Sequence, residues 1–88
     1  AGKEVSALAP GSLLPGTLIA TFDKNDRPLT HALGGQVTVY LGHDESRIRT
    51  LAPDPDSHQG RWKKASILLH VGDGVQPRLN GKLYRVIE

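Results

Sequence analysis

Glycine, proline and polar turn residues interrupt the chain roughly every 8 to 12 residues, a spacing typical of small all-β domains. The segments between these interruptions alternate apolar and polar side chains, as strands with one buried face do. Five segments have this pattern: 17–22, 36–41, 47–51, 63–71 and 83–87. They predict an all-β domain, or a β-dominated α+β domain, in which five or six short antiparallel strands curl into a small barrel or half-barrel.

The alternation also predicts which side chains point the same way. In segment 47–51, Ile48 lies on one face, and Arg47, Arg49 and Leu51 lie on the other, which is the exposed face in the ordinary interpretation. The other sets are Leu18, Ala20 and Phe22 in the first segment; Val37, Val39 and Leu41 in the second, opposite Gln36, Thr38 and Tyr40; and Ala65, Ile67, Leu69 and Val71 in the fourth.

A chain of 88 residues is expected to form one small domain, 1–88. We divide it into an irregular N-terminal arm, 1–15, and a β-barrel core, 16–88. Within the arm, Lys3–Ala9 has the composition of one or two helical turns, which Pro10 and Gly11 would end. The sequence contains no cysteine, so burial of apolar side chains has to stabilise the domain without a disulfide.

Charge is distributed unevenly along the chain. Residues 1–46 hold three basic and five acidic side chains, whereas residues 47–88 hold eight basic and four acidic ones. A basic second half is compatible with an acidic partner, and it is also common in domains that bind nothing acidic. No segment reaches the roughly 18 consecutive apolar residues of a membrane span, so we expect none.

Several motifs follow one another in an ordered series. Gly16–Phe22 reads Gly-Thr-Leu-Ile-Ala-Thr-Phe, and a polar turn and His31 come after it. Gly34–Gly42 then runs from a glycine pair into Val-Tyr-Leu-Gly, and the chain closes with Asn80-Gly81 and Tyr84–Glu88. This order resembles the β-barrel half of small bacterial papain-like cell-wall amidases and endopeptidases, the superfamily that includes CHAP-type domains.

The resemblance implies a catalytic site that this chain does not carry. Such enzymes use a cysteine thiolate, a histidine and a third polar group that orients the histidine. The chain has no cysteine, Gln36 stands where the histidine is expected, and Ala52-Pro53 occupies the region of the orienting group. A glutamine cannot shuttle a proton near neutral pH. We therefore predict a non-enzymatic domain with no catalytic residues; the alternative is a hydrolase completed by another chain or by residues that precede Ala1.

The resemblance also implies where a ligand would bind. His31, Gln36 and Tyr40 are the candidates for a groove that has lost its chemistry and still holds a protein or a peptidoglycan fragment. The competing interpretation of His31 is a surface-loop residue without a role. The resemblance favours a bacterial protein, in the periplasm or secreted rather than cytoplasmic.

A second candidate site combines an aromatic ring with cations. Arg61, Trp62, Lys63 and Lys64 could stack a base and hold phosphates, which gives the alternative function of a small basic β-barrel that binds nucleic acid. The competing interpretation places Trp62 at one end of the barrel, and the size of this side chain in a small core favours it. The cations that would widen the patch are Arg47, Arg49, Lys82 and Arg85.

The sequence predicts neither a metal nor a cofactor. The four histidines, His31, His43, His58 and His70, lie on separate segments without the short spacing of metal ligands. The acidic groups near them, Asp54 with Asp56 and Asp44 with Glu45, are typical of solvated loops and turns.

Overall fold

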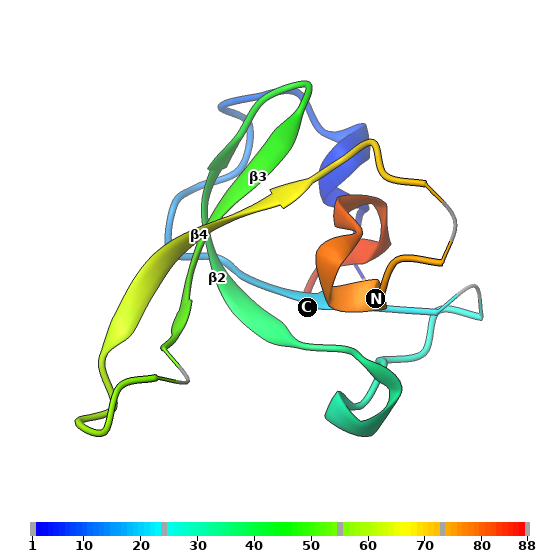
Figure 1. Cartoon of the computed structure of the whole chain (residues 1–88). Coiled ribbons are helices and arrows are strands. Elements are labelled where there is room, and N and C mark those ends of the chain that lie inside the picture. The colour runs from blue at the N-terminus through cyan, green and yellow to red at the C-terminus, as the bar shows by residue number, and fades with distance from the viewer. Residues whose placement is uncertain (1, 24, 55, 73, 88) are drawn as a thin grey trace.

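The computed structural model describes residues 2–23, 25–54, 56–72 and 74–87. The described part contains one antiparallel sheet with the strand order β4-β3-β2-β1-β5 (Figure 1). Its strands are β1 (Leu18–Thr21), β2 (Val37–His43), β3 (Arg47–Pro53), β4 (Trp62–Leu68) and β5 (Tyr84–Val86). The prediction of a β-dominated domain with five antiparallel strands in a half-barrel is confirmed.

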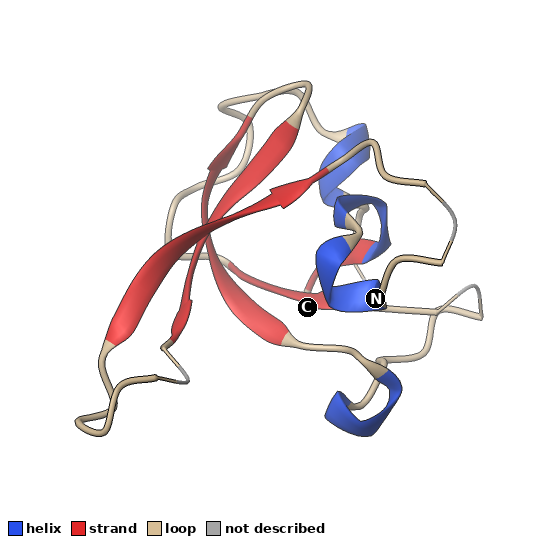
Figure 2. Ribbon diagram, in the orientation of Figure 1, coloured by secondary structure: helices blue, strands red, loops and turns tan. Residues whose placement is uncertain are grey.

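Short 3₁₀ turns supply the helical structure of the described residues: η1 (Val5–Ala7), η2 (His31–Leu33), η3 (Pro77–Leu79) and η4 (Gly81–Leu83). The sheet twists strongly, and η1, η3 and η4 lie together on one side of it (Figure 2). Contacts join η1 to β5 and η4, and η3 to β4 and η4. The turns therefore complete a core that the curved sheet alone would leave open. Within the described residues, no helix has the length and apolar character needed to cross a membrane.

The core lies between the inner face of the sheet and these turns. Its buried side chains form one cluster: Val5, Ile19, Tyr40, Ile48, Ile67, Leu69 and Tyr84. Three threonines on the strands, Thr21, Thr38 and Thr50, are buried as well. The Thr38 hydroxyl donates to the Leu51 carbonyl oxygen at 3.0 Å, and the Thr21 hydroxyl oxygen accepts the Gln36 amide at 3.0 Å. These bonds offset the cost of removing the hydroxyls from water.

Strand β2 buries its more polar face. Thr38 and Tyr40 point into the core, whereas the side chain of Val37, on the opposite face, is 58 % exposed. The pattern predicted the two faces correctly. Apolar character alone would choose the valine face as the buried one, but the other face carries the side chain with the most surface to bury, Tyr40. Strand β2 is the middle strand of the sheet, and Tyr40 belongs to the buried core cluster (Figure 1).

A β-bulge in β2 places His43 on the same face as Tyr40. Tyr40 pairs with Thr50, but the next pair is Gly42 with Arg49, so Leu41 is an extra residue. Residues three apart in a regular strand lie on opposite faces, and the extra residue restores them to one face. The strand pattern of the sequence ended at residue 41, which is too early: the strand continues to His43, and its side chain is buried.

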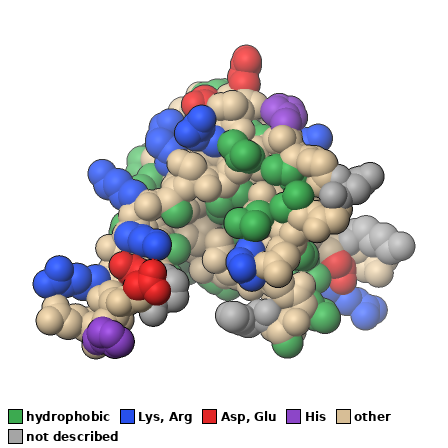
Figure 3. Space-filling view, viewed as in Figure 1, with side chains coloured by type: hydrophobic (Ala, Val, Ile, Leu, Met, Phe, Trp, Pro, Cys, Tyr) green, Lys and Arg blue, Asp and Glu red, His purple; other side chains and the backbone are tan. Residues whose placement is uncertain are grey.

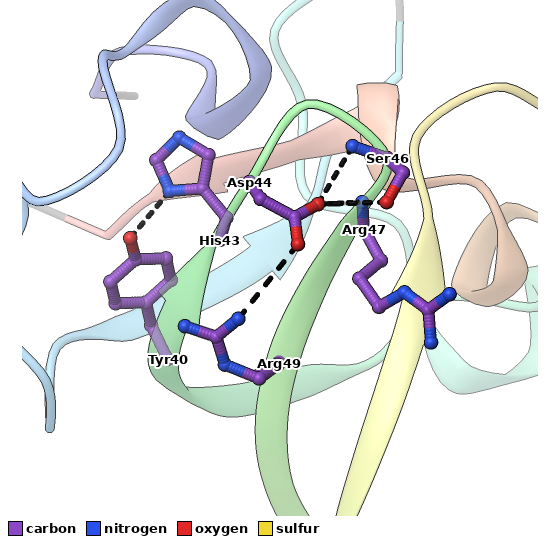
Figure 4. A network of polar contacts seen from close by, with 6 residues as sticks. All are labelled: Tyr40, His43, Asp44, Ser46, Arg47 and Arg49. Carbon is purple, nitrogen blue, oxygen red and sulfur yellow. Dashed lines mark hydrogen bonds and ion pairs between the residues drawn. The ribbon is translucent and has the colours of Figure 1, made fainter.

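The imidazole of His43 joins the sheet to the N-terminal arm. Its Nε2 lies 2.8 Å from the Leu8 carbonyl oxygen, and its Nδ1 lies 2.5 Å from the Tyr40 hydroxyl (Figure 4). A carbonyl only accepts, so Nε2 carries the hydrogen and Nδ1 accepts from Tyr40. Both ring nitrogens are satisfied in a neutral imidazole. Burial raises the pKa of Tyr40 above its ordinary value of 10.0, which keeps its hydroxyl protonated as a donor.

Asp44 organises the turn that follows His43. One carboxylate oxygen accepts from the Ser46 amide at 2.8 Å, the Ser46 hydroxyl at 2.8 Å and the Arg47 amide at 3.0 Å (Figure 4). These donors lower the pKa of Asp44 to about 2. An aspartate that bonds the backbone two residues ahead is a common turn former. The carboxylate pair of the sequence is therefore part of an exposed β2–β3 turn.

The N-terminal arm covers the outer edge of β5. The Gly2 amide donates to the Val86 carbonyl oxygen at 3.0 Å, and the Val86 amide donates to the Lys3 carbonyl oxygen at 3.1 Å. Glu4 forms an isolated bridge with Arg85, and Val5 is completely buried. The helical turn expected within 3–9 is the 3₁₀ turn η1. The arm is thus an integral part of the core.

We expect Tyr40→Phe to lower the free energy of unfolding by about 1 to 3 kcal/mol, because it leaves Nδ1 of a buried imidazole without a hydrogen-bond partner. Urea denaturation followed by circular dichroism measures this difference. His58→Ala removes an exposed histidine and should change the free energy by less than about 0.5 kcal/mol. Equal stabilities for Tyr40→Phe and the unaltered chain would contradict the role given to this bond.

Candidate functional site

Gln36 lies immediately before β2, at the end of the sheet where hydrogen bonds link three segments. Its side-chain amide donates to the Tyr84 hydroxyl at 2.7 Å, and that hydroxyl donates to the Arg78 carbonyl oxygen at 2.8 Å. The Gln36 backbone accepts from the Thr21 amide at 3.1 Å. Gln36 is consequently held in one orientation by groups on β1, β5 and the loop before β5.

An open pocket of about 640 Å³ adjoins Gln36. Its walls combine one amide and one guanidinium, from Gln36 and Arg78, with apolar side chains. The complete lining is Leu29, Gly35, Gln36, Val37, Ala52, Pro53 and Arg78. Pockets that orient small ligands have this composition, a mostly apolar wall with a few fixed polar groups.

Two glycines shape the approach to this pocket. Gly34 has a φ of +82°, in the left-handed region that favours glycine. Gly35 packs so closely on Leu29 that a Cβ atom would overlap the Leu29 carbonyl oxygen. The Gly-Gly pair therefore lets the chain turn sharply into β2 and sets Leu29 against the start of the strand.

The structure separates two of the three groove candidates of the sequence, Gln36 and Tyr40. Gln36 is half-buried at the pocket, whereas Tyr40 is 0 % exposed and bonds His43 in the core. The backbone of His31 begins η2, and its side chain lies outside the described part of the structure. Tyr40 is therefore a core residue and forms no part of an open groove, because its bulk fills the middle of the half-barrel.

Tyr84 fixes the side chain of Gln36 through the hydrogen bond to its hydroxyl. Its side chain is completely buried, and this burial raises its pKa to about 12, although the bond from Gln36 and the charge of Arg78 act in the opposite direction. The hydroxyl therefore stays protonated over the physiological range. It can accept from Gln36 and donate to Arg78 at the same time.

The basic patch of the sequence divides between the two faces of β4. Trp62 and Lys64 pair with Pro53 and Leu51 on the outer face, and Lys63 points to the other side. The Lys63 ammonium lies 3.7 Å from the Asp54 carboxylate. All four side chains, Arg61, Trp62, Lys63 and Lys64, are exposed.

The interpretation of Trp62 as a plug of the barrel is wrong. Its side chain is 53 % exposed, because the first half of β4 extends with β3 beyond the body of the core. In Figure 3, basic side chains lie on this projecting part, and others are spread over the rest of the view. A large ring is thus available at the surface beside Lys64.

The wider set of cations is scattered. Arg47 and Arg49 share the outer face of β3, as predicted, and Arg49 lies 4.0 Å from Asp44. Arg85 is instead engaged by Glu4 at 3.2 Å and by Asp26 at 3.1 Å on the far side of the sheet. The three strands that lie between β4 and β5 prevent one continuous basic surface.

The acidic and histidine side chains of the described residues form no group of three that could hold a metal ion. His43 is committed to Tyr40 and Leu8, and His70 lies 3.0 Å from the Glu45 carbonyl oxygen through Nε2. Neither arrangement leaves a set of converging ligands.

Of the residues that line the pocket, sequence reasoning named only Gln36 as a candidate for binding, and it gave no sign of Leu29 or Arg78. Both lie in segments without a strand pattern, and only the tertiary fold brings them to the start of β2. The Asn80-Gly81 turn was recognisable, but nothing in the sequence indicated that the loop before it lies beside Gln36.

Comparisons of the chain with protein-family models, with curated proteins and with solved structures found no match.

The raised pKa of Tyr84 predicts a loss of stability in alkali. The folded-state pKa of about 12 exceeds the unfolded value of 10.0, so the folded state binds this proton more tightly. The contribution of this proton to the free energy of unfolding is complete below pH 10. It is lost as the pH rises through about 12, which lowers the free energy of unfolding by at most ~2 to 3 kcal/mol.

Urea unfolding at a series of pH values measures this dependence, and tyrosinate absorbance follows the titration. Tyr84→Phe should show a smaller alkaline decline than the unaltered chain, with the one remaining tyrosine, Tyr40, still contributing. If the free energy of unfolding fell equally steeply with pH in the two proteins, the assignment to Tyr84 would be refuted.

Proposed function

We propose that this chain is a non-catalytic binding domain that holds a short peptide segment, from a protein or a cell-wall stem peptide, in the pocket at Gln36. The observation that carries the proposal is the fixed Gln36 amide beside the Arg78 guanidinium in a largely apolar hollow. A peptide presents amide groups, apolar side chains and carboxylates, and this pocket has a complement for each.

The lining residues support binding without chemistry. The described residues that line the pocket include no histidine, cysteine or carboxylate, and the buried tyrosine that bonds to Gln36 has a pKa of about 12. A general acid or base needs a pKa near the working pH. Nucleophilic catalysis of the papain type also needs a thiolate, and the sequence has no cysteine.

The resemblance to papain-like amidases is compatible with this location. Gln36 occupies the position where the resemblance places the histidine, and Ala52-Pro53 occupies the region of the orienting group. Both positions line the same pocket, although one lies immediately before β2 and the other at the end of β3. This meeting of two positions, both placed by the same resemblance, supports our proposal of a bacterial binding domain derived from an amidase scaffold.

Arg78→Ala should weaken binding of a peptidoglycan stem tripeptide that contains γ-D-glutamate by about tenfold or more, because a hydrogen-bonded charge pair is lost. The substitution spares the Arg78 carbonyl oxygen, so the bond from Tyr84 is retained. Isothermal titration calorimetry measures the affinity, with Arg47→Ala, at the other end of β3, as the matched control.

Equal affinities of Arg78→Ala and Arg47→Ala for the tripeptide would show that the pocket is not the binding site. Release of amino acids from the tripeptide by the isolated chain, detected by mass spectrometry, would overturn its non-catalytic character.

A second candidate function, nucleic-acid binding, is favoured by the exposed Trp62 ring beside Arg61 and Lys64. For this candidate, the affinity for an oligo(dT) strand would fall as the salt concentration rises. A plot of the logarithm of the association constant against the logarithm of the salt concentration would have a slope of about −0.7 for each neutralised phosphate. Trp62→Ala would remove about 1 to 3 kcal/mol of stacking per base. Fluorescence anisotropy in two salt concentrations tests both effects, and an affinity independent of salt would reject this candidate.

A further inference from the structure

The two edges of the sheet differ in the described structure. Backbone bonds from Gly2 and Lys3 to Val86 cover the outer edge of β5. Strand β4 ends the sheet on the other side, and it pairs only with β3. An uncovered edge presents unpaired amides and carbonyls, and it is a template for another strand.

The register shows which groups point outward. The Asp54 amide donates to the Arg61 carbonyl oxygen, and the Leu69 amide donates to the Ser46 carbonyl oxygen, so odd-numbered β4 residues face β3. Because the bonding direction alternates along an antiparallel strand, the amides and carbonyls of Trp62, Lys64 and Ser66 face away from β3. None of these outward groups has a hydrogen-bond partner among the described residues.

The free stretch ends before Leu68. Gly81 of η4 approaches so closely that an added Cβ would lie 3.0 Å from the Leu68 carbonyl oxygen. The open edge therefore extends over 62–66, which matches about five residues of an added strand, or roughly 17 Å. This stretch belongs to the part of β4 that projects from the core (Figure 1).

The charges on this edge select its partner. Lys64 on the outer face and Lys63 on the inner face are both exposed, and Arg49 lies opposite Ser66. A hollow of about 560 Å³, lined in part by Leu41, Arg49, Lys64 and Ser66, adjoins the edge on the outer face. On the outer face, a strand with carboxylates would meet Lys64 and Arg49, whereas Lys63 on the inner face already lies 3.7 Å from the Asp54 carboxylate.

We propose that the open edge of β4 over 62–66 binds an acidic extended peptide, which adds to the sheet as a sixth strand. The amides and carbonyls of Trp62, Lys64 and Ser66 supply main-chain hydrogen bonds, and Lys64, with Arg49 on the same outer face, supplies charge complementarity. A second copy is disfavoured, because antiparallel pairing centred on Lys64 sets two lysines opposite each other. A nucleic-acid backbone lacks the amide donors that would satisfy the outward carbonyls.

The probe is an acetylated and amidated peptide of about seven alternating valine and glutamate residues, a length that covers the edge. A valine–lysine peptide is its control. Hydrogen exchange at the amides of Trp62, Lys64 and Ser66 should slow on binding, because these amides gain a partner. The only tryptophan, Trp62, also reports binding by fluorescence.

Ser66→Pro is the sharpest variant, since it deletes one outward amide and changes no charge. Proline is tolerated at an edge where its missing amide would face solvent, so the fold should be retained. We expect Ser66→Pro to lower the affinity for the valine–glutamate peptide by about tenfold or more, whereas Ser66→Ala should bind this peptide with the affinity of the unaltered chain. Lys64→Glu should reverse the preference toward the valine–lysine peptide.

N-methyl groups at alternate residues of the peptide give a test that needs no variant. In one peptide, the N-methyl groups replace the amide hydrogens that face β4, and binding should be abolished. In the other peptide, they replace the amide hydrogens that face solvent, and the affinity should be unchanged. Arg78→Ala should bind the valine–glutamate peptide normally, which separates this edge from the pocket.

Several results would overturn the proposal: equal binding by both methylated sets, equal affinity for the two peptides, or dimerisation of the chain through β4 in analytical ultracentrifugation. Binding of oligo(dT) with no binding of the acidic peptide would assign the surface to nucleic acid instead. Absence of peptide binding to a folded chain would also reject it.

Discussion

The hydrogen-bonded chain from Tyr40 through His43 to the Leu8 carbonyl oxygen connects the centre of the sheet to the N-terminal arm. Both ring nitrogens of His43 are committed, so neither side of the link can change without leaving a buried polar group unpaired. The bulge at Leu41 makes the link geometrically feasible, because it turns His43 to the face of Tyr40. The arm then continues through η1 to the edge of β5, where Gly2 and Lys3 bond to Val86.

This arrangement determines which parts of the sheet are covered and which are exposed. The arm and the turns η1, η3 and η4 cover the inner face and one edge of the sheet, so in the described structure part of its outer face and the β4 edge over 62–66 are left uncovered. Apolar side chains on that outer face, Leu18, Val37 and Trp62 among them, stay half exposed. The pocket at Gln36 lies where β2 begins and β3 ends, and the open edge lies at the projecting start of β4. A small half-barrel thus presents two separate surfaces with different chemistry: one fixed amide with a guanidinium, and one unpaired backbone between lysines.

Particular residues show how far sequence reasoning reaches. The alternation in Arg47–Leu51 and in Ala65–Val71 predicted the buried positions correctly, with Ile48, Ile67 and Leu69 inside. The same reasoning failed at His43, since a bulge changes the period by one residue and leaves no local signature. It also failed at Trp62: the large apolar surface of the ring favoured the core, but the β3–β4 pair extends past the core and carries the ring with it. For the candidate site, Gln36 was identified from its place in a motif, whereas Arg78 and Leu29 reach the pocket through contacts between distant segments.

By itself, the sequence determined the type of structure: short strands, frequent turns, one antiparallel sheet, and a chain without the thiol of a cysteine hydrolase. These properties follow from side-chain alternation, turn chemistry and the presence or absence of single residue types, all of which are local. Only the tertiary structure decided that Tyr40 is buried and Gln36 is at a pocket, that the arm seals β5, and that β4 is open. These outcomes depend on the order in which strands pair and on one bulge, and pairing between distant segments is set by the total burial and hydrogen bonding of the whole chain.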